Sequence, residues 1–278
     1  MKNVIACIDG ASYTESVCDY AAWAATRLAA PLEFLHVLIR NDHAKVDASG
    51  SIGLGAQESL LEELSDLDER RSTIAREHGR QLLDGAKQRA IAAGVSQVDT
   101  RQRHGEFVDT LVEMEPDARL YVLGQHDHES KPKRFLLDHN LESAVRALHR
   151  PILVANASFV EPHRFMIAYD GSATGRKMIE MVADSPLLSG LECHVVMVGD
   201  DEDALRWASG RLREAGFQVT SQRLDGEPAN VLADYVQQQH INMMVMGAYG
   251  HSRIRHLIVG STTTAILRQS KVPVLILR

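Results

Sequence analysis

No part of this sequence is apolar for long enough to cross a membrane. A bilayer-spanning helix needs about 20 consecutive apolar residues, and no run among the 278 residues approaches that length. Basic residues are in the minority, with 30 lysines and arginines against 37 aspartates and glutamates and a net charge of −7. A protein that coats nucleic acid normally shows the opposite balance. We therefore expect no membrane and no nucleic acid as partner, whereas a local site for a small anion stays open.

Cysteine is scarce, and its positions form no pattern. Cys7, Cys18 and Cys193 are widely spaced and include no CxxC pair, which argues against a disulfide framework. Their apolar or helix-like surroundings favour buried, reduced thiols. The N-terminus, MKNVIACIDG, has only five apolar residues in a row before an aspartate. That run is shorter than a secretory signal requires, so we expect a cytoplasmic protein.

The sequence repeats itself. The apolar run that ends in Asp9-Gly10 is echoed by a second run that ends in Asp170-Gly171. Near the ends of the two copies, Pro151-Ile-Leu-Val matches Pro273-Val-Leu-Ile. Helical patterns beginning near Val108 and near Ala229 also correspond. A repeat of this kind predicts two similar structural units.

The two units span residues 1–156 and 164–278, and residues 155–163 link them. This length fits two domains, since a domain usually has roughly 100–200 residues. Within each unit, short Val/Ile/Leu runs alternate with longer helical patterns. Apolar strands separated by helices indicate a parallel sheet that is covered on both faces. Right-handed crossovers then give an open, doubly wound α/β domain.

The first unit carries an insertion, at about residues 40–93, between its second strand and its next helix. Apolar residues there recur at spacings of three and four, which predicts an amphipathic helix. Its apolar stripe holds Leu60, Leu64, Leu67, Ile74, His78 and Leu82. Its acidic face, most simply a solvated one, holds Glu58, Glu62, Glu63, Asp66, Asp68 and Glu69.

A glycine pattern near the end of the second unit indicates a phosphate site. A strand ends at Gly247, a loop carries Gly250, and Gly260 precedes a Ser/Thr run that opens a helix. Glycines let the backbone approach a ligand closely, and the free N–H groups of a helix N-terminus favour a phosphate. Asp170 ends another strand and faces the same crevice in a doubly wound sheet. The pattern is neither a Walker A loop nor the dinucleotide GxGxxG.

The spacing resembles that of the nucleotide-binding members of the universal stress protein family. They carry Gly, two residues, Gly, nine residues, Gly, and then Ser or Thr; Gly247, Gly250, Gly260 and Ser261 fit without a gap. The likeness spans both halves and implies two tandem open doubly wound domains with parallel five-stranded sheets, like those of the adenine nucleotide alpha hydrolases. It implies an ATP-binding regulatory module in the stress response, with the nucleotide held by the second unit.

The resemblance also implies the residues around ATP. A magnesium ion could accompany the nucleotide, as a hydrolase or phosphotransferase would usually need, and Asp170 could hold it through water. The adenosine would meet Asp170 and its two preceding neighbours, the main chain of Val198, and Met246. The glycines would admit the ribose and phosphates, and the start of the helix would hold the phosphates. The full set is Ala168, Tyr169, Asp170, Val198, Met246, Gly247, Gly250, Gly260, Ser261, Thr262 and Thr263.

The first unit departs from this pattern. Asp127 stands where the second unit has Gly250, and Asp138 stands where it has Gly260. A carboxylate at either position would repel a phosphate. We therefore expect no ATP there in the family's manner, although an adenosine-shaped crevice could persist. The matching residues that remain are Asp9, Val37 and Gly124.

Other functions stay open from the residues alone. The run His126-Asp127-His128-Glu129 could hold zinc with His139 or His104, or could simply be a solvated loop. His251 could act as a base, but no spacing joins a nucleophile to it, so we name no catalytic residue and no metal ligand. A slow ATP hydrolase or phosphotransferase is one alternative, and a nucleotide-free structural or interaction protein is another.

The family resemblance also implies dimers formed along the final strands. In this tandem chain, residues 151–155 and 273–278 can pair with each other and make an internal pseudo-dimer. Two chains could then associate further.

Overall fold

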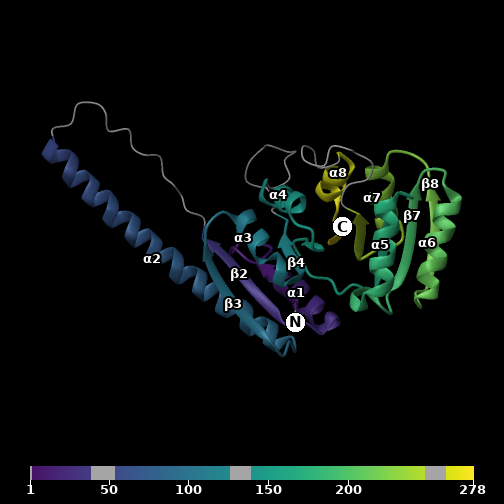
Figure 1. Ribbon diagram of the computed structural model, residues 1–278, viewed down its shortest axis with the longest axis horizontal. Helices are drawn as coiled ribbons and strands as arrows, with labels where there is room; N and C mark the ends of the chain where they lie inside the picture. Colours follow the sequence, from purple (N-terminus) through teal and green to yellow (C-terminus); the bar gives the residue numbers. More distant parts are fainter. Residues whose placement is uncertain (1, 39–53, 126–138, 248–260) are drawn as a thin grey trace.

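The computed structural model describes residues 2–38, 54–125, 139–247 and 261–278 (Figure 1). Its strands form one sheet in the order β3-β2-β1-β4-β5-β10-β9-β6-β7-β8. The first half contributes β1 (Asn3–Cys7), β2 (Leu32–Leu38), β3 (Val98–His104), β4 (Ala118–Gly124) and β5 (Ile152–Ala155). The second half contributes β6 (Arg164–Tyr169), β7 (Glu192–Val198), β8 (Val219–Leu224), β9 (Met243–Gly247) and β10 (Val274–Leu277).

Each half has the same strand order, third-second-first-fourth-fifth, and every strand pair inside a half is parallel. The halves meet at β5 and β10, which run antiparallel with Leu153 opposite Leu275. These two leucines are counterparts in the repeat, so the halves are related by a pseudo-twofold axis between the two strands. The predicted fold class is confirmed, and so is the predicted pairing of the closing strands.

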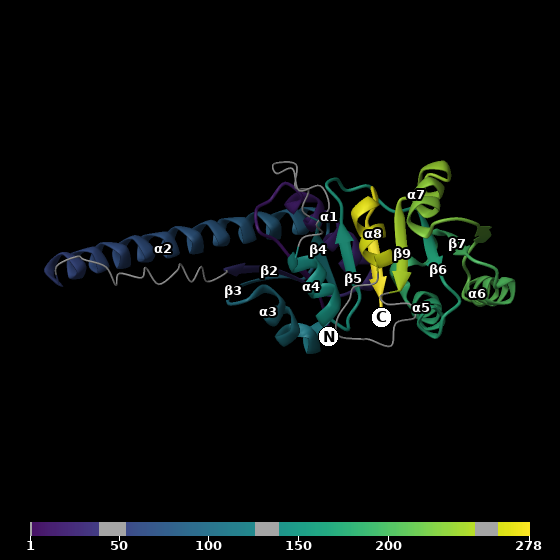
Figure 2. The same ribbon diagram turned by 90° about the horizontal axis from the view of Figure 1, so that it is seen from above.

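Helices cover both faces of the sheet, which is why the strands are apolar on both sides (Figure 2). Side chains alternate along each strand: Val4 and Ala6 enter one core, and Ile5 and Cys7 enter the other. The first core lies under α1 (Thr14–Leu28), α2 (Leu54–Ala92), α5 (Ala173–Asp184) and α6 (Glu202–Glu214). The second lies under α3 (Phe107–Met114), α4 (His139–Ala147), α7 (Pro228–Gln238) and α8 (Ser261–Gln269). Two short 3-10 helices are η1 (Glu115–Asp117) and η2 (Pro186–Leu188).

The predicted insertion is not an extra element between the second strand and the next helix. The helix α2 is itself the crossover between β2 and β3, the counterpart of α6, lengthened to 39 residues. Only its C-terminal part packs on the body, and the rest projects away from it (Figures 1 and 2). The stripe read from the sequence is therefore not buried along its length, since Leu67 is 44% and Ile74 is 68% exposed. No helix in the described part of the chain is long and apolar enough to cross a membrane.

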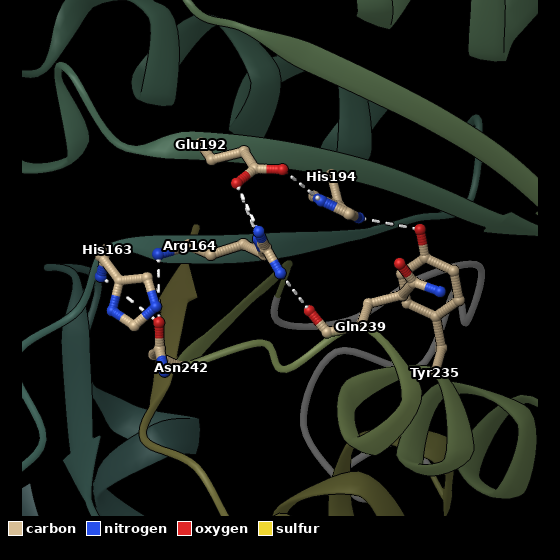
Figure 3. A network of polar contacts seen from close by, with 7 residues as sticks. All are labelled: His163, Arg164, Glu192, His194, Tyr235, Gln239 and Asn242. Carbon is tan, nitrogen blue, oxygen red and sulfur yellow. Dashed lines mark hydrogen bonds and ion pairs between the residues drawn. The ribbon is translucent and has the colours of Figure 1, made fainter.

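A polar network fixes the amino-terminal edge of the second half (Figure 3). Arg164 donates from Nε to Oε2 of Glu192 at 2.8 Å, and the other carboxylate oxygen lies 3.2 Å from Nε2 of His194. The hydrogen bond from Arg164 holds the pKa of Glu192 below its usual value. Nδ1 of the buried His194 lies 2.8 Å from the hydroxyl of Tyr235 on α7. The network thus ties β6, β7 and α7 together at the end opposite the carboxyl ends of the strands.

Replacing Leu153 by alanine should destabilise the protein by about 2–5 kcal/mol, because its fully buried side chain packs at the seam of the two halves. Ile74→Ala is the control, since an exposed side chain should change stability by only about 0.5 kcal/mol or less. Urea unfolding followed by circular dichroism measures both variants. Equal shifts in the two unfolding midpoints would contradict the seam as a packed core.

Candidate functional site

Three strand ends of the second half converge at the carboxyl-terminal edge of the sheet. On the central strand, Ala168 pairs with Val196 of β7 on one side and with Met246 of β9 on the other. Ala168, Val198 and Met246 contribute to the core on the α7/α8 face. Ala168 and Val198 are only half-buried. This edge corresponds to the place where a doubly wound sheet usually binds a ligand, and it is called the crevice of the second half below.

The turn after β6 places a carboxylate, that of Asp170, at the same edge of the sheet. Gly171 has a φ of +72°, a conformation that glycine adopts without strain, and it turns the chain into α5. Oδ1 of Asp170 accepts a hydrogen bond from the backbone N–H of Ser172 at 3.0 Å. Ser172 in turn caps α5 by accepting from the N–H of Gly175. Oδ2 of the exposed Asp170 has no hydrogen-bond donor among the described residues, so it can accept from a ligand.

At the end of β9, the described residues leave the main chain of Gly247 uncovered. Among the described residues, a Cβ placed on Gly247 would meet only Cγ2 of Thr174, at 3.9 Å, which is ordinary van der Waals contact. Thr174 is a small side chain in the first turn of α5 and is half-buried. A ligand can therefore approach the main chain at Gly247.

The same place in the first half is filled by a tyrosine. A Cβ on Gly124 would lie 1.9 Å from the ring of Tyr13, which is 4% exposed. The hydroxyl of Tyr13 donates to Oδ2 of Asp9 at 2.7 Å. Both features that the second half offers, the open glycine and the available oxygen, are thus taken up by one side chain. A cavity of about 90 Å³ remains beside it, with Val37 and Phe107 in its lining.

Comparison with known proteins decides the family. Residues 1–156 and 199–278 match the model described as the universal stress protein family. Universal stress protein Slr1230 of Synechocystis is 35% identical over an alignment of 287 positions, which covers all of both chains. The chain belongs to the universal stress protein family. Universal stress protein Rv2623 of Mycobacterium tuberculosis is 23% identical over 73% of this chain and 77% of its own.

A solved universal stress protein structure from Archaeoglobus fulgidus has the same fold. The superposition has a TM-score of 0.73 at 19% sequence identity, and it covers 99% of this chain and 96% of that one. The coverage shows that the likeness includes both halves of this universal stress protein and the sheet that joins them.

Sequence comparison within the chain missed Tyr13. Asp9 corresponds to Asp170, so the fourth residue after each aspartate also corresponds, and these residues are Tyr13 and Thr174. The difference in size was visible in the sequence. What was not visible is that this position lies against the glycine at the end of the fourth strand, a contact between segments more than 100 residues apart.

The remaining predicted residues fall in three groups. Tyr169 is buried in the core on the α5/α6 face, so its side chain lies on the other side of the sheet from Ala168. The helix α8 begins at Ser261, as the sequence predicts, and Thr263 in its first turn is buried. The side chains of Ser261 and Thr262 are not described. Lying outside the described residues are Gly250, Gly260, His126, Asp127, His128, Glu129, Asp138 and His251.

The thiols of the folded protein should not react with 5,5′-dithiobis(2-nitrobenzoate) at pH 8. Burial raises the pKa of Cys7, with a further contribution from the charge of Asp9, and burial raises the pKa of Cys18 to about 12. Burial also raises the pKa of Cys193. Absorbance should report no fast thiol in the native chain and all three after unfolding in guanidinium. A thiol that reacts in the native chain as fast as in the unfolded one would contradict the packing at that cysteine.

Proposed function

We propose that this universal stress protein binds one adenine nucleotide, ATP, in its second half and acts as a nucleotide-dependent regulatory module in the stress response. The observation that carries the proposal is the contrast between the two crevices. Among the described residues, nothing in the second half covers Gly247 or donates to the second oxygen of Asp170, whereas Tyr13 occupies both equivalent places in the first half.

Each part of the nucleotide would have a partner of suitable chemistry. The half-buried Ala168 and Val198 offer an apolar floor and main-chain groups for adenine. The carboxylate of Asp170 accepts hydrogen bonds from hydroxyl groups such as those of ribose. The amino end of α8 favours phosphates, because its first N–H groups have no partner inside the helix. Tyr169, with its side chain on the other face, would contribute its main chain alone.

A magnesium ion fits the same proposal. Phosphates carry the charge that attracts it, and Mg²⁺ is usually held by one or two carboxylates, several waters and the phosphates themselves. The exposed Asp170 lies at the same edge of the sheet and would contact the ion through a bridging water while it accepts from the ribose. When bound, the ion would neutralise phosphate charge.

The first half, by the same argument, does not bind ATP. Accommodating a ribose there requires moving a buried tyrosine ring and breaking its hydrogen bond to Asp9. The sequence adds Asp127 and Asp138 at the two positions where the second half has glycine. The steric block and the charge act on different parts of the nucleotide, so they reinforce each other.

Thr174→Tyr should transfer the block to the second half and abolish ATP binding. The new ring would cover Gly247, as that of Tyr13 covers Gly124. Its hydroxyl would donate a hydrogen bond to Oδ2 of Asp170, as that of Tyr13 donates to Asp9. Loss of two hydrogen bonds to charged groups, each worth about 1.5–3 kcal/mol, weakens binding roughly a hundredfold or more. Calorimetric titration with ATP and magnesium measures the affinity.

Two variants control this experiment. Thr174→Val keeps the size of the side chain and should bind ATP nearly as the natural protein does. Lys177→Tyr places the same aromatic residue on the exposed face of α5 and should also bind. Unchanged affinity in a folded Thr174→Tyr variant would refute the site.

A further inference from the structure

A larger cavity, of about 250 Å³, lies at the seam of the two halves on the α1/α5 face of the sheet. This face is opposite to the one that carries Ala168 and Met246. Residues of both halves line the cavity, among them Leu28, Leu120, Met181, Leu187, Leu275 and Leu277. An engineered apolar cavity of about 150 Å³ already admits benzene, so this one has room for a larger apolar group.

Chain connectivity explains why the seam is hollow at this end. The pseudo-twofold axis relates this cavity to a second place, where Tyr20 stands for Met181 and Leu153 stands for Leu275. The linker covers that second place: Phe159 meets the ring of Tyr20 edge-on at 4.8 Å. The hydroxyl of Tyr20 also donates to Oδ1 of Asn156 at 3.1 Å. One chain has one linker, so only one of the two equivalent places can be filled in this way.

The open place also differs in charge from the covered one. Arg119 and Arg150, both half-buried, line the cavity, and their counterparts in the repeat are the uncharged Asn242 and Val272. Arg119 donates to the main-chain oxygen of Leu28 at 2.9 Å, and Arg150 donates to that of Glu115 at 3.4 Å. Neither guanidinium forms an ion pair with a carboxylate of the described residues. Each keeps further N–H donors, because a guanidinium has five.

The neighbouring carboxylate is already engaged. The Oε1 atom of Glu115 accepts a hydrogen bond from the backbone N–H of Arg150 at 2.9 Å and another from that of His149. Burial by itself would raise the pKa of Glu115, but these hydrogen bonds hold it below its usual value. Glu115 therefore stays bound to the main chain rather than neutralising either arginine.

We propose that the seam cavity binds a medium-chain fatty acid. The leucines of the lining receive the alkyl chain, and the two half-buried arginines of the lining bind the carboxylate. An apolar pocket with a few converging polar groups is the usual form of a small-molecule site. Arginine is well suited to a carboxylate, because its planar donors match the two oxygens. The site is independent of the nucleotide crevice, which lies on the other face.

Calorimetric titration of the full-length protein with decanoate, below its micelle concentration, tests the proposal. Saturable binding of about one decanoate per chain is expected. Decanol, which has the same alkyl chain without the charge, should bind at least about tenfold more weakly, since a hydrogen bond to a charged group is worth a factor of roughly 10–100. No saturable binding of decanoate, or equal binding of decanoate and decanol, would overturn the proposal.

Variants separate the cavity from the rest of the surface. Met181→Trp fills the cavity and should abolish the binding of both compounds. Val160→Trp, at an exposed position of the linker, should leave the affinity for both unchanged. Arg119→Gln and Arg150→Gln should each weaken the binding of decanoate about 10- to 100-fold and leave the binding of decanol unchanged. If the arginine variants lost affinity for decanoate and decanol equally, the arginines would have only a structural role, and the assignment would be overturned. If Met181→Trp fails to fold, the arginine variants decide.

Discussion

The antiparallel pairing of β5 with β10 is the contact on which the rest of the structure depends. In either half alone, the closing strand would be an edge with unpaired N–H and C=O groups, and such an edge invites association with other chains. Here the two edges satisfy each other within one molecule, with Leu153 opposite Leu275 at the pseudo-twofold axis. The pairing fixes where each half lies, and so places the two crevices and the seam cavity.

Covalent fusion allows the two halves to diverge. Two separate identical chains would carry the same residue at equivalent positions, whereas this chain has Tyr13 in one crevice and Thr174 in the other. It also has a 39-residue crossover helix in the first half against a shorter one, Glu202–Glu214, in the second. The single linker breaks the symmetry once more, because it covers one end of the seam. The halves therefore differ at the crevice, at the crossover helix and at the seam.

The sequence alone predicted the features that depend on local pattern. Alternating apolar runs and helical patterns predicted the parallel sheets, and the family resemblance implied that the closing strands pair. Asp170 and Gly247 were placed at one crevice because both end parallel strands, and the structure brings those strand ends together. The start of α8 at Ser261 followed from the Ser/Thr run after Gly260.

Features that depend on contacts between distant segments could not be predicted in this way. The block by Tyr13 requires knowing what lies against Gly124. The spacing of apolar residues predicted the helix α2 but not that Ile74 would stay in solvent, because a pattern shows which face is apolar and not what covers it. Residues of both halves and the path of the linker form the seam cavity, so no local sequence pattern predicts it.

The central claim is that one crevice accepts a nucleotide and the other is closed by its own side chain. Native mass spectrometry of the full-length protein with ATP and magnesium counts the bound nucleotides directly. The account predicts one nucleotide per chain at saturation, and none per chain for Thr174→Tyr. Two nucleotides per chain would show that Tyr13 does not close the first crevice, and no bound nucleotide on the natural chain would show that the second crevice is not a nucleotide site.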